Sequence, residues 1–234
     1  RTALTFLAID RPFRTLQVTS AKMSEGKSTT AANLAVAMCR AEGKRVLLVD
    51  ADLRRPRMHS MFTLRNKVGL CDVLLRDLPM TDAVVPIEGF NGLLSVLPVG
   101  PRPSGLNAEL LSSSVFSGLL REALDSFDLV ILDTPPVLSV ADPLTVSSQA
   151  DAVLFVVHAG EATAAQVRSS LDALVGVGAS VVGAILNSFD ARAAGYHGYY
   201  GYYGYYGYFG AGEYAETAEA GSTVSSSKRG RRGS

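Results

Sequence analysis

The sequence is poor in features that mark several common functional classes. It holds only two cysteines, Cys39 and Cys71, both in apolar stretches, so neither a disulfide-stapled secreted fold nor a cysteine metal site is expected. Lysine plus arginine number 22, as do aspartate plus glutamate, which leaves no net charge to attract nucleic acid or a membrane surface. No apolar run approaches the roughly 18–20 residues of a membrane span, and no signal peptide is visible. These absences favour a cytoplasmic protein without a nucleic-acid partner.

Apolar residues are abundant, at 47% of the chain, which is enough for a large core. Through residues 1–190, short apolar β-branched runs alternate with helical stretches. This alternation predicts one α/β domain with a mostly parallel sheet covered by helices on both faces. The expected strands are Leu16–Thr19, Arg45–Val49, Leu93–Val99, Leu129–Leu132, Ala152–Val157 and Val181–Leu186. The expected helices are Ser28–Arg40, closed by Gly43, then Val115–Ser126, Val140–Gln149 and Ala164–Val175.

The composition changes near Ala191. All nine tyrosines lie beyond this point, from Tyr196 to Tyr214, in a Gly-Tyr repeat followed by a Gly/Ala/Ser/Glu-rich stretch with a basic end. Such a composition cannot offset the entropy of ordering, so residues 191–234 are predicted to form a disordered tail. Taken alone, the repeat also fits an adhesive low-complexity segment that stacks through its aromatic rings.

A phosphate-binding loop is the most specific motif. Residues 21–28 read AKMSEGKS between a predicted strand and a predicted helix, and they fit the P-loop pattern except for Ala21 at its first position. Backbone N–H groups of such a loop cradle the phosphates of ATP, its lysine reaches the β- and γ-phosphates, and its serine hydroxyl binds Mg²⁺. If position 21 needs a positive φ, alanine strains it by about 1 kcal/mol. The expected nucleotide-binding residues are Ala21, Lys22, Ser24, Glu25, Gly26, Lys27, Ser28 and Thr29.

Two predicted strands end in carboxylates. The segment 46–56, VLLVDADLRRP, ends with Asp50, Asp52 and two arginines, and the segment 129–136, LVILDTPP, ends with Asp133. Ligands of open α/β sheets bind outside the carboxyl ends of the strands, so we expect the three acids beside the phosphate loop. Asp133 is expected to hold Mg²⁺ through water.

Three segments, GKSTTAANLA, LLVDADLRRP and FDLVILDTPPV, resemble in this order the Walker A, A′ and B sites of the bacterial tyrosine kinases (BY-kinases) of capsular and exopolysaccharide synthesis. The resemblance covers about residues 1–190, and DADLRRP is its most specific piece. It implies an ATP- and Mg²⁺-dependent protein-tyrosine autokinase that regulates polysaccharide synthesis or export. The implied phosphate acceptors are Tyr196, Tyr199, Tyr200, Tyr202, Tyr203, Tyr205, Tyr206, Tyr208 and Tyr214.

The resemblance also implies roles for single residues. Asp50 would be the base or orienting group for the tyrosine hydroxyl, Asp52 and Asp133 would hold Mg²⁺ with Ser28, and Arg54 or Arg55 would offset charge on the transferring group beside Lys27. Asn187 would lie on the adenine side of the nucleotide, although a turn residue before Ser188 is an equal interpretation.

The first residues, RTAL, resemble the end of the family's Glu/Arg oligomerisation motif, so the chain is expected to be cut inside that motif. The resemblance implies a homo-oligomer with transfer between subunits. It also implies a membrane activator or chain-length regulator, encoded separately or upstream in the same chain, and thus a place at the inner face of the membrane.

Two other functions stay open on the sequence. Lys22 lies five residues before Lys27, where partition and division-site ATPases carry a second lysine that crosses a dimer interface, although it also fits a solvated loop residue. The departures from the Walker A pattern, Ala21 and the absence of Pro-Gly before Glu25, leave room for an assembly module that binds nucleotide without kinase activity.

Overall fold

A computed structural model describes residues 12–76, 78–103 and 108–190. The nine tyrosines and the oligomerisation remnant at residues 1–4 therefore lie outside the described residues. The chain divides into two units, residues 1–189 and 190–234, and every described element belongs to the first.

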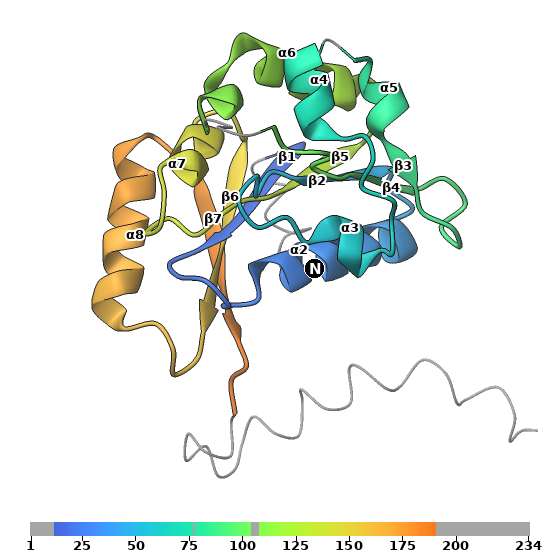
Figure 1. Cartoon of the computed structure of the whole chain (residues 1–234). Coiled ribbons are helices and arrows are strands. Elements are labelled where there is room, and N and C mark those ends of the chain that lie inside the picture. The colour runs from blue at the N-terminus through green and yellow to red at the C-terminus, as the bar shows by residue number, and fades with distance from the viewer. Residues whose placement is uncertain (1–11, 77, 104–107, 191–234) are drawn as a thin grey trace, which may run out of the picture. The chain divides into compact units, whose positions relative to one another are not determined.

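A seven-stranded sheet in the order β3-β4-β2-β5-β1-β6-β7 forms the centre of this unit (Figure 1). Six strands are parallel, and only β3, at one edge, pairs antiparallel with its neighbour β4. The strands are β1 (Thr15–Ser20), β2 (Val46–Asp50), β3 (Val85–Pro86), β4 (Leu94–Leu97), β5 (Leu129–Asp133), β6 (Ala152–His158) and β7 (Val181–Asn187). All six expected strands are present, and the predicted fold class is confirmed.

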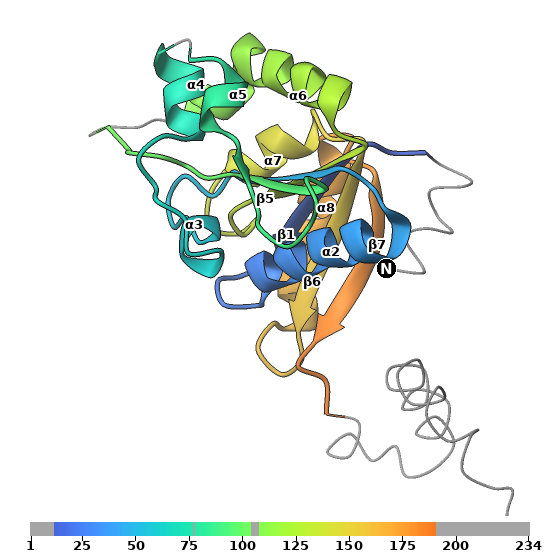
Figure 2. The ribbon, with the colours of Figure 1, turned by 90° about the vertical axis from the view of Figure 1, so that its right-hand side faces the viewer.

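Helices cover both faces of the sheet, as the fully buried central strands require. Figure 2 shows α2 and α3 on one side, with α4, α5 and α6 on the other. The helices are α2 (Lys27–Glu42), α3 (Met58–Met61), α4 (Leu70–Arg76), α5 (Met80–Ala83), η1, a 3₁₀ turn (Ala108–Ser112), α6 (Ser114–Ser126), α7 (Asp142–Ser147) and α8 (Ala164–Gly176). None of the helices in the described part of the chain is long and apolar enough to cross a membrane.

Alternation along the central strands builds a hydrophobic core on each face of the sheet. Leu16 and Ile131 pack with Met38 of α2 on one face, whereas Leu47 and Val130, one residue out of phase, pack with α6 on the other. The central strands β1, β2 and β5 are buried on both faces and end at the same edge. This edge carries the candidate site.

Three short helices and β3, all between residues 58 and 86, were not predicted. Each spans no more than seven residues, so no helical period is visible in the sequence. By contrast, Gly43 closes α2 as expected: its φ is 62° and its N–H donates to the carbonyl of Cys39.

Candidate nucleotide and phosphoryl-transfer site

The phosphate loop joins the end of β1 to the start of α2. Gly26 immediately precedes α2 with a φ of 86°, and a Cβ there would lie 2.1 Å from Nδ2 of Asn187. The left-handed backbone conformation is what requires glycine here, because the Asn187 amide is the end of a side chain that could move aside. The N-terminus of α2 opens beside this turn, which suits the binding of phosphate.

The backbone strain in this loop falls on Ser24 and not on Ala21. Ser24 has a φ of 67°, whereas Ala21 keeps a conformation ordinary for alanine and packs, fully buried, with Val137 and Phe155. The condition under which strain was expected at Ala21, a positive φ, is therefore not met. A small side chain suits position 21 because it packs in the hydrophobic cluster that includes Phe155 of β6 and Leu174 of α8.

Glu25 braces the loop from inside. It is only 1% exposed, and its carboxylate accepts hydrogen bonds from the backbone N–H groups of Lys22 at 2.6 Å and His158 at 3.3 Å. The side-chain amide of Asn187 donates to the carbonyl of Glu25 at 3.1 Å. These bonds tie β6 and β7 to the loop, and they give Asn187 a position beside the nucleotide-binding turn.

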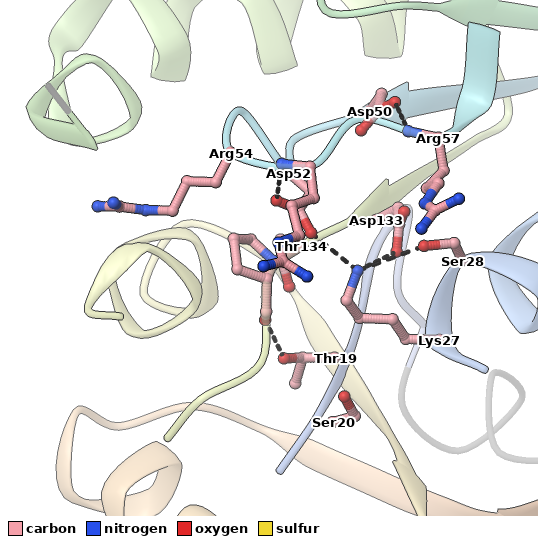
Figure 3. Close-up of polar contacts among 12 residues, drawn as sticks. Thr19, Ser20, Lys27, Ser28, Asp50, Asp52, Arg54, Arg57, Asp133 and Thr134 are labelled. Atoms are coloured by element: carbon pink, nitrogen blue, oxygen red, sulfur yellow. Dashed lines mark hydrogen bonds and ion pairs between the residues drawn. The ribbon is translucent and has the colours of Figure 1, made fainter. Parts of the chain in front are cut away.

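Lys27 brings the acids together. Its Nζ lies 3.0 Å from Oδ2 of Asp52, 3.6 Å from Oδ1 of Asp133 and 3.3 Å from the Ser28 hydroxyl (Figure 3). Asp50 is the register partner of Asp133 across β2 and β5. The expected convergence of the three acids on the loop is thus present in the structure.

Asp50 and Asp133 differ in their hydrogen bonds and in their pKa values. Asp50 is fully buried, and one oxygen accepts hydrogen bonds from the backbone N–H groups of Arg57 and Met58, both at 2.9 Å. Burial, reinforced by the charge of Asp133, raises the pKa of Asp50 to about 7. Burial likewise raises the pKa of Asp133 to about 6, although Lys27 and Ser28 oppose the shift. A site with so much uncompensated carboxylate is built to receive positive charge.

The free carboxylate oxygens suit a Mg²⁺ ion that is coordinated partly by the protein and partly by a bound nucleotide. One oxygen of Asp50 and both oxygens of Asp133 are buried without a hydrogen bond. In the described ranges, no three acidic, histidine or cysteine side chains are arranged to hold a metal by themselves. Mg²⁺ usually takes one or two carboxylates and completes its shell with phosphate oxygens and water, which matches a partial set beside a phosphate loop.

Three arginines line the nucleotide pocket, which has a volume of about 370 Å³. Figure 3 shows Arg57 beside Ser28 and Asp133, whereas Arg54 extends away from Lys27. The guanidinium of Arg54 instead pairs with Asp142 at 3.2 Å, and Arg55 donates its backbone N–H to Asp52 at 2.9 Å. Sequence reasoning selected Arg54 or Arg55 and missed Arg57; the extended basic run RRPR was the available signal.

Hydroxyl groups hold the ends of β1 and β5 together. The Thr19 hydroxyl donates to the carbonyl of Pro135 at 2.8 Å, and the Thr134 hydroxyl donates to the carbonyl of Val18 at 3.1 Å. Both threonines are fully buried, so these bonds fix the position of Asp133 relative to the phosphate loop. Neither residue was selected from the sequence.

Comparison with known proteins identifies the family. A family model described as an AAA domain matches residues 13–173. The chain is 43% identical to Tyrosine-protein kinase YwqD of Bacillus subtilis over 188 residues, which are 80% of this chain and 77% of that protein. The kinase domain of the Escherichia coli tyrosine kinase ETK superposes with a TM-score of 0.76 at 33% identity, over 85% of this chain and 76% of that chain.

A more distant solved structure shares the fold alone. The septum site-determining protein MinD of Pyrococcus horikoshii, complexed with Mg-ADP, superposes with a TM-score of 0.63 at 22% identity, over 74% of this chain and 69% of that chain. The resemblance first noted in the three Walker segments is confirmed by the relatives at higher identity. The chain belongs to the bacterial tyrosine-protein kinases, built on a P-loop nucleotide-binding domain.

Proposed function

We propose that this kinase transfers the γ-phosphoryl group of ATP to tyrosines in its own residues 196–214. The observation that carries the proposal is the position of Lys27, the first residue of α2, whose Nζ lies 3.0 Å from Asp52 and 3.6 Å from Asp133. This arrangement places a cation, two acids and a helix N-terminus around the space that the terminal phosphate of ATP would enter.

Each group would contribute by position and charge. Lys27 would exchange its carboxylate partners for the β- and γ-phosphate oxygens. Bound Mg²⁺, held by Ser28 and Asp133, would neutralise charge that develops on the phosphates. Arg57, already beside Ser28 in Figure 3, would contact the transferring group.

The two acids of the A′ segment would have separate roles. Asp52 lines the nucleotide pocket, whereas Asp50 is fully buried and holds the backbone of Arg57 and Met58. We therefore assign Asp52 to the acceptor hydroxyl and to the metal. Asp50 would act as a positioning residue that fixes the segment carrying Arg57.

The acceptors and partners follow from the family and from the composition of the tail. Residues 196–208 hold eight tyrosines among glycines and one histidine, and a Gly-rich chain adapts easily to an active site. Transfer would run between subunits of a homo-oligomer. A membrane activator, separate or in the same polypeptide, would place the kinase at the inner face of the membrane, where its phosphorylation would regulate capsule or exopolysaccharide production.

Lys27→Met tests the site directly. The full chain with Mg²⁺ and γ-labelled ATP should label its own tyrosines, and the variant should lose at least ~100-fold in rate because a charge on the transferring phosphate is no longer balanced. Lys67→Met, which removes an exposed lysine, is the matched control and should retain labelling. Undiminished phosphotyrosine in a folded Lys27→Met protein would reject the assignment. Release of free phosphate without labelled protein would indicate a plain ATPase.

A further inference from the structure

A second cavity adjoins the nucleotide pocket. It has a volume of about 620 Å³ and is lined by segments that follow β2 and β4 and by the first residue of α7. Arg54 lines both cavities and therefore lies between them. Asn66 closes another side: its amide exchanges two hydrogen bonds with the backbone of Gly100, at 2.8 and 3.3 Å.

The lining of this cavity carries net positive charge. Arg54 and Arg102 contribute two positive charges and Asp142 one negative charge, which leaves one positive charge. Asp142 is only 2% exposed, and both of its oxygens accept hydrogen bonds from Arg54: Oδ2 from Nε at 3.2 Å and Oδ1 from Nη2 at 3.5 Å. Arg102 donates from one nitrogen to the carbonyls of Leu53 and Arg54, at 2.8 and 2.7 Å. Two guanidinium groups are thus held at the cavity wall by the fold itself.

Size and apolar lining select the kind of anion. The volume lies within the range of roughly 300–1,000 Å³ that is typical of small-molecule pockets, far beyond what inorganic phosphate fills. Leu53, Pro101 and Pro103 add apolar surface next to the arginines. An aryl phosphate matches both properties, because its ring packs on apolar walls while its oxygens accept bidentate hydrogen bonds from guanidinium groups.

We propose that this cavity binds a phosphotyrosine already formed in the tail and so presents a neighbouring tyrosine to the nucleotide pocket. The proposal rests on the proposed function, since it takes the tail as acceptor. The repeat YYGYYGYYG places tyrosines one to three residues apart, and three extended residues span about 10 Å. A phosphate seated against Arg54 therefore leaves the next ring within reach of the adjoining pocket. The first phosphate on a tail accelerates the addition of later ones.

Binding is measured first, with the dephosphorylated full chain saturated with Mg-ADP so that the phosphate loop is occupied. The probe is a fluorescent peptide of residues 199–206, bearing either phosphotyrosine or tyrosine at position 203. We expect the phosphopeptide to bind at least tenfold more tightly. A peptide with glutamate at position 203, and inorganic phosphate as competitor, should both bind more weakly than the phosphopeptide. Equal affinity for the two tyrosine peptides, or tighter binding of either alternative anion, overturns the proposal.

Two substitutions should move this affinity in opposite directions. Arg102→Gln removes one guanidinium and should abolish the preference for the phosphopeptide, whereas Arg121→Gln, at an exposed site on α6, should keep it. Asp142→Asn removes the negative charge beside Arg54 and should tighten phosphopeptide binding several-fold. A folding defect would weaken binding in both variants, so this opposite response separates recognition from instability. Unchanged phosphopeptide affinity in both variants contradicts the assignment.

Intact-mass analysis of the self-labelled full chain supplies the kinetic test. At partial conversion, wild type should show an excess of unlabelled and multiply phosphorylated chains over a random distribution. Arg102→Gln should return the distribution to random while the rate of the first phosphate stays within about twofold. Random labelling in the wild type overturns the priming proposal but leaves the proposed function intact. Absence of any label rejects the proposed function. In that case the peptide-binding measurement still tests whether the cavity binds phosphotyrosine, because it does not depend on kinase activity.

Discussion

Single residues at the site hold conformations and charge states that cost the folded protein free energy. Ser24 adopts a positive φ without being glycine, and Asp50 and Asp133 are buried together with raised pKa values. Costs of this kind gather at functional sites because the surrounding fold over-determines the geometry. Substitution can relieve both the positive φ at Ser24 and the buried charge at Asp50.

Ser24→Gly should stabilise the domain. A left-handed backbone costs an L-residue on the order of 1 kcal/mol that glycine does not incur, so the unfolding free energy should rise by about that amount. Ser139→Gly, at an exposed loop position without positive φ, should lower it instead, because glycine gains more freedom in the unfolded chain. Chemical denaturation of both variants measures the difference. A loss of stability in Ser24→Gly would mean that the serine side chain supports the loop.

Asp50 predicts an unusual pH dependence for the protein free of nucleotide and magnesium. Its pKa rises from 3.8 to about 7 on folding, so the folded state binds more protons than the unfolded state between those values. The stability contribution is then fully present below pH 3.8 and is lost as pH rises through 7. We expect the unfolding free energy to fall between pH 5 and pH 8, and Asp50→Asn to reduce that fall, with the remainder coming from Asp133, whose pKa is raised to about 6.

The control for this prediction is Asp128→Asn. A hydrogen bond from Arg45 lowers the pKa of Asp128 to about 2, so its contribution does not change between pH 5 and pH 8. The slope of unfolding free energy against pH should therefore match wild type. A wild-type profile that rises over this range would show that Asp50 is not buried as a titrating group.

At the scale of elements, the site depends on strands that are distant in sequence but adjacent in the sheet. The phosphate loop follows β1, the A′ acids follow β2, and Asp133 ends β5, which lies between those two strands. The outer strands contribute as well, since β6 and β7 reach the loop through His158 and Asn187. The loop is thus supported on both sides.

Asn187→Ala tests the support from β7. Losing the hydrogen bond to the carbonyl of Glu25 should cost about 1 kcal/mol of stability and weaken Mg-ADP binding several-fold, because the loop is freed on one side. Leu186→Ala, at an exposed neighbouring position on the same strand, is the control and should leave Mg-ADP affinity unchanged. Calorimetric titration gives both affinities. If Asn187→Ala and Leu186→Ala bind Mg-ADP with equal affinity, Asn187 is only a turn residue and does not support the phosphate loop.

At the scale of the whole molecule, the acceptors and the catalytic residues belong to different units. Every element of the site lies within residues 1–189, and every tyrosine lies between 196 and 214. Catalysis and substrate supply can therefore be separated by truncation. This separation allows an experiment in which one chain serves only as enzyme and the other only as acceptor.

Removal of residues 191–234 should leave thermal stability and Mg-ADP binding intact, because no described core residue is lost. Mixed with full-length Lys27→Met, the truncated chain should label the tail of its inactive partner. Phosphotyrosine immunoblotting resolves the two chains by mass. A partner that stays unlabelled while wild type labels itself would restrict transfer to within one chain.

The sequence by itself determined six of the seven strands, the long helices and the position of the three acids, because each depends on local pattern. Apolar β-branched runs specify buried strands, and the phosphate loop, the DAD segment and Asp133 each come at the end of such a run. The parallel arrangement then brings their carboxyl ends to one edge by rule, with no further information needed.

Only the tertiary structure decided what depends on contacts between distant segments. It turned Arg54 toward Asp142, 88 residues away, and left Arg57 beside Ser28. It placed the positive φ of the phosphate loop at Ser24 and left Ala21, packed against Val137 and Phe155, without one. It also formed the cavity beside Arg54 from four separate segments. A side chain's direction and a loop's conformation follow from what packs against them, and sequence spacing carries no record of those neighbours.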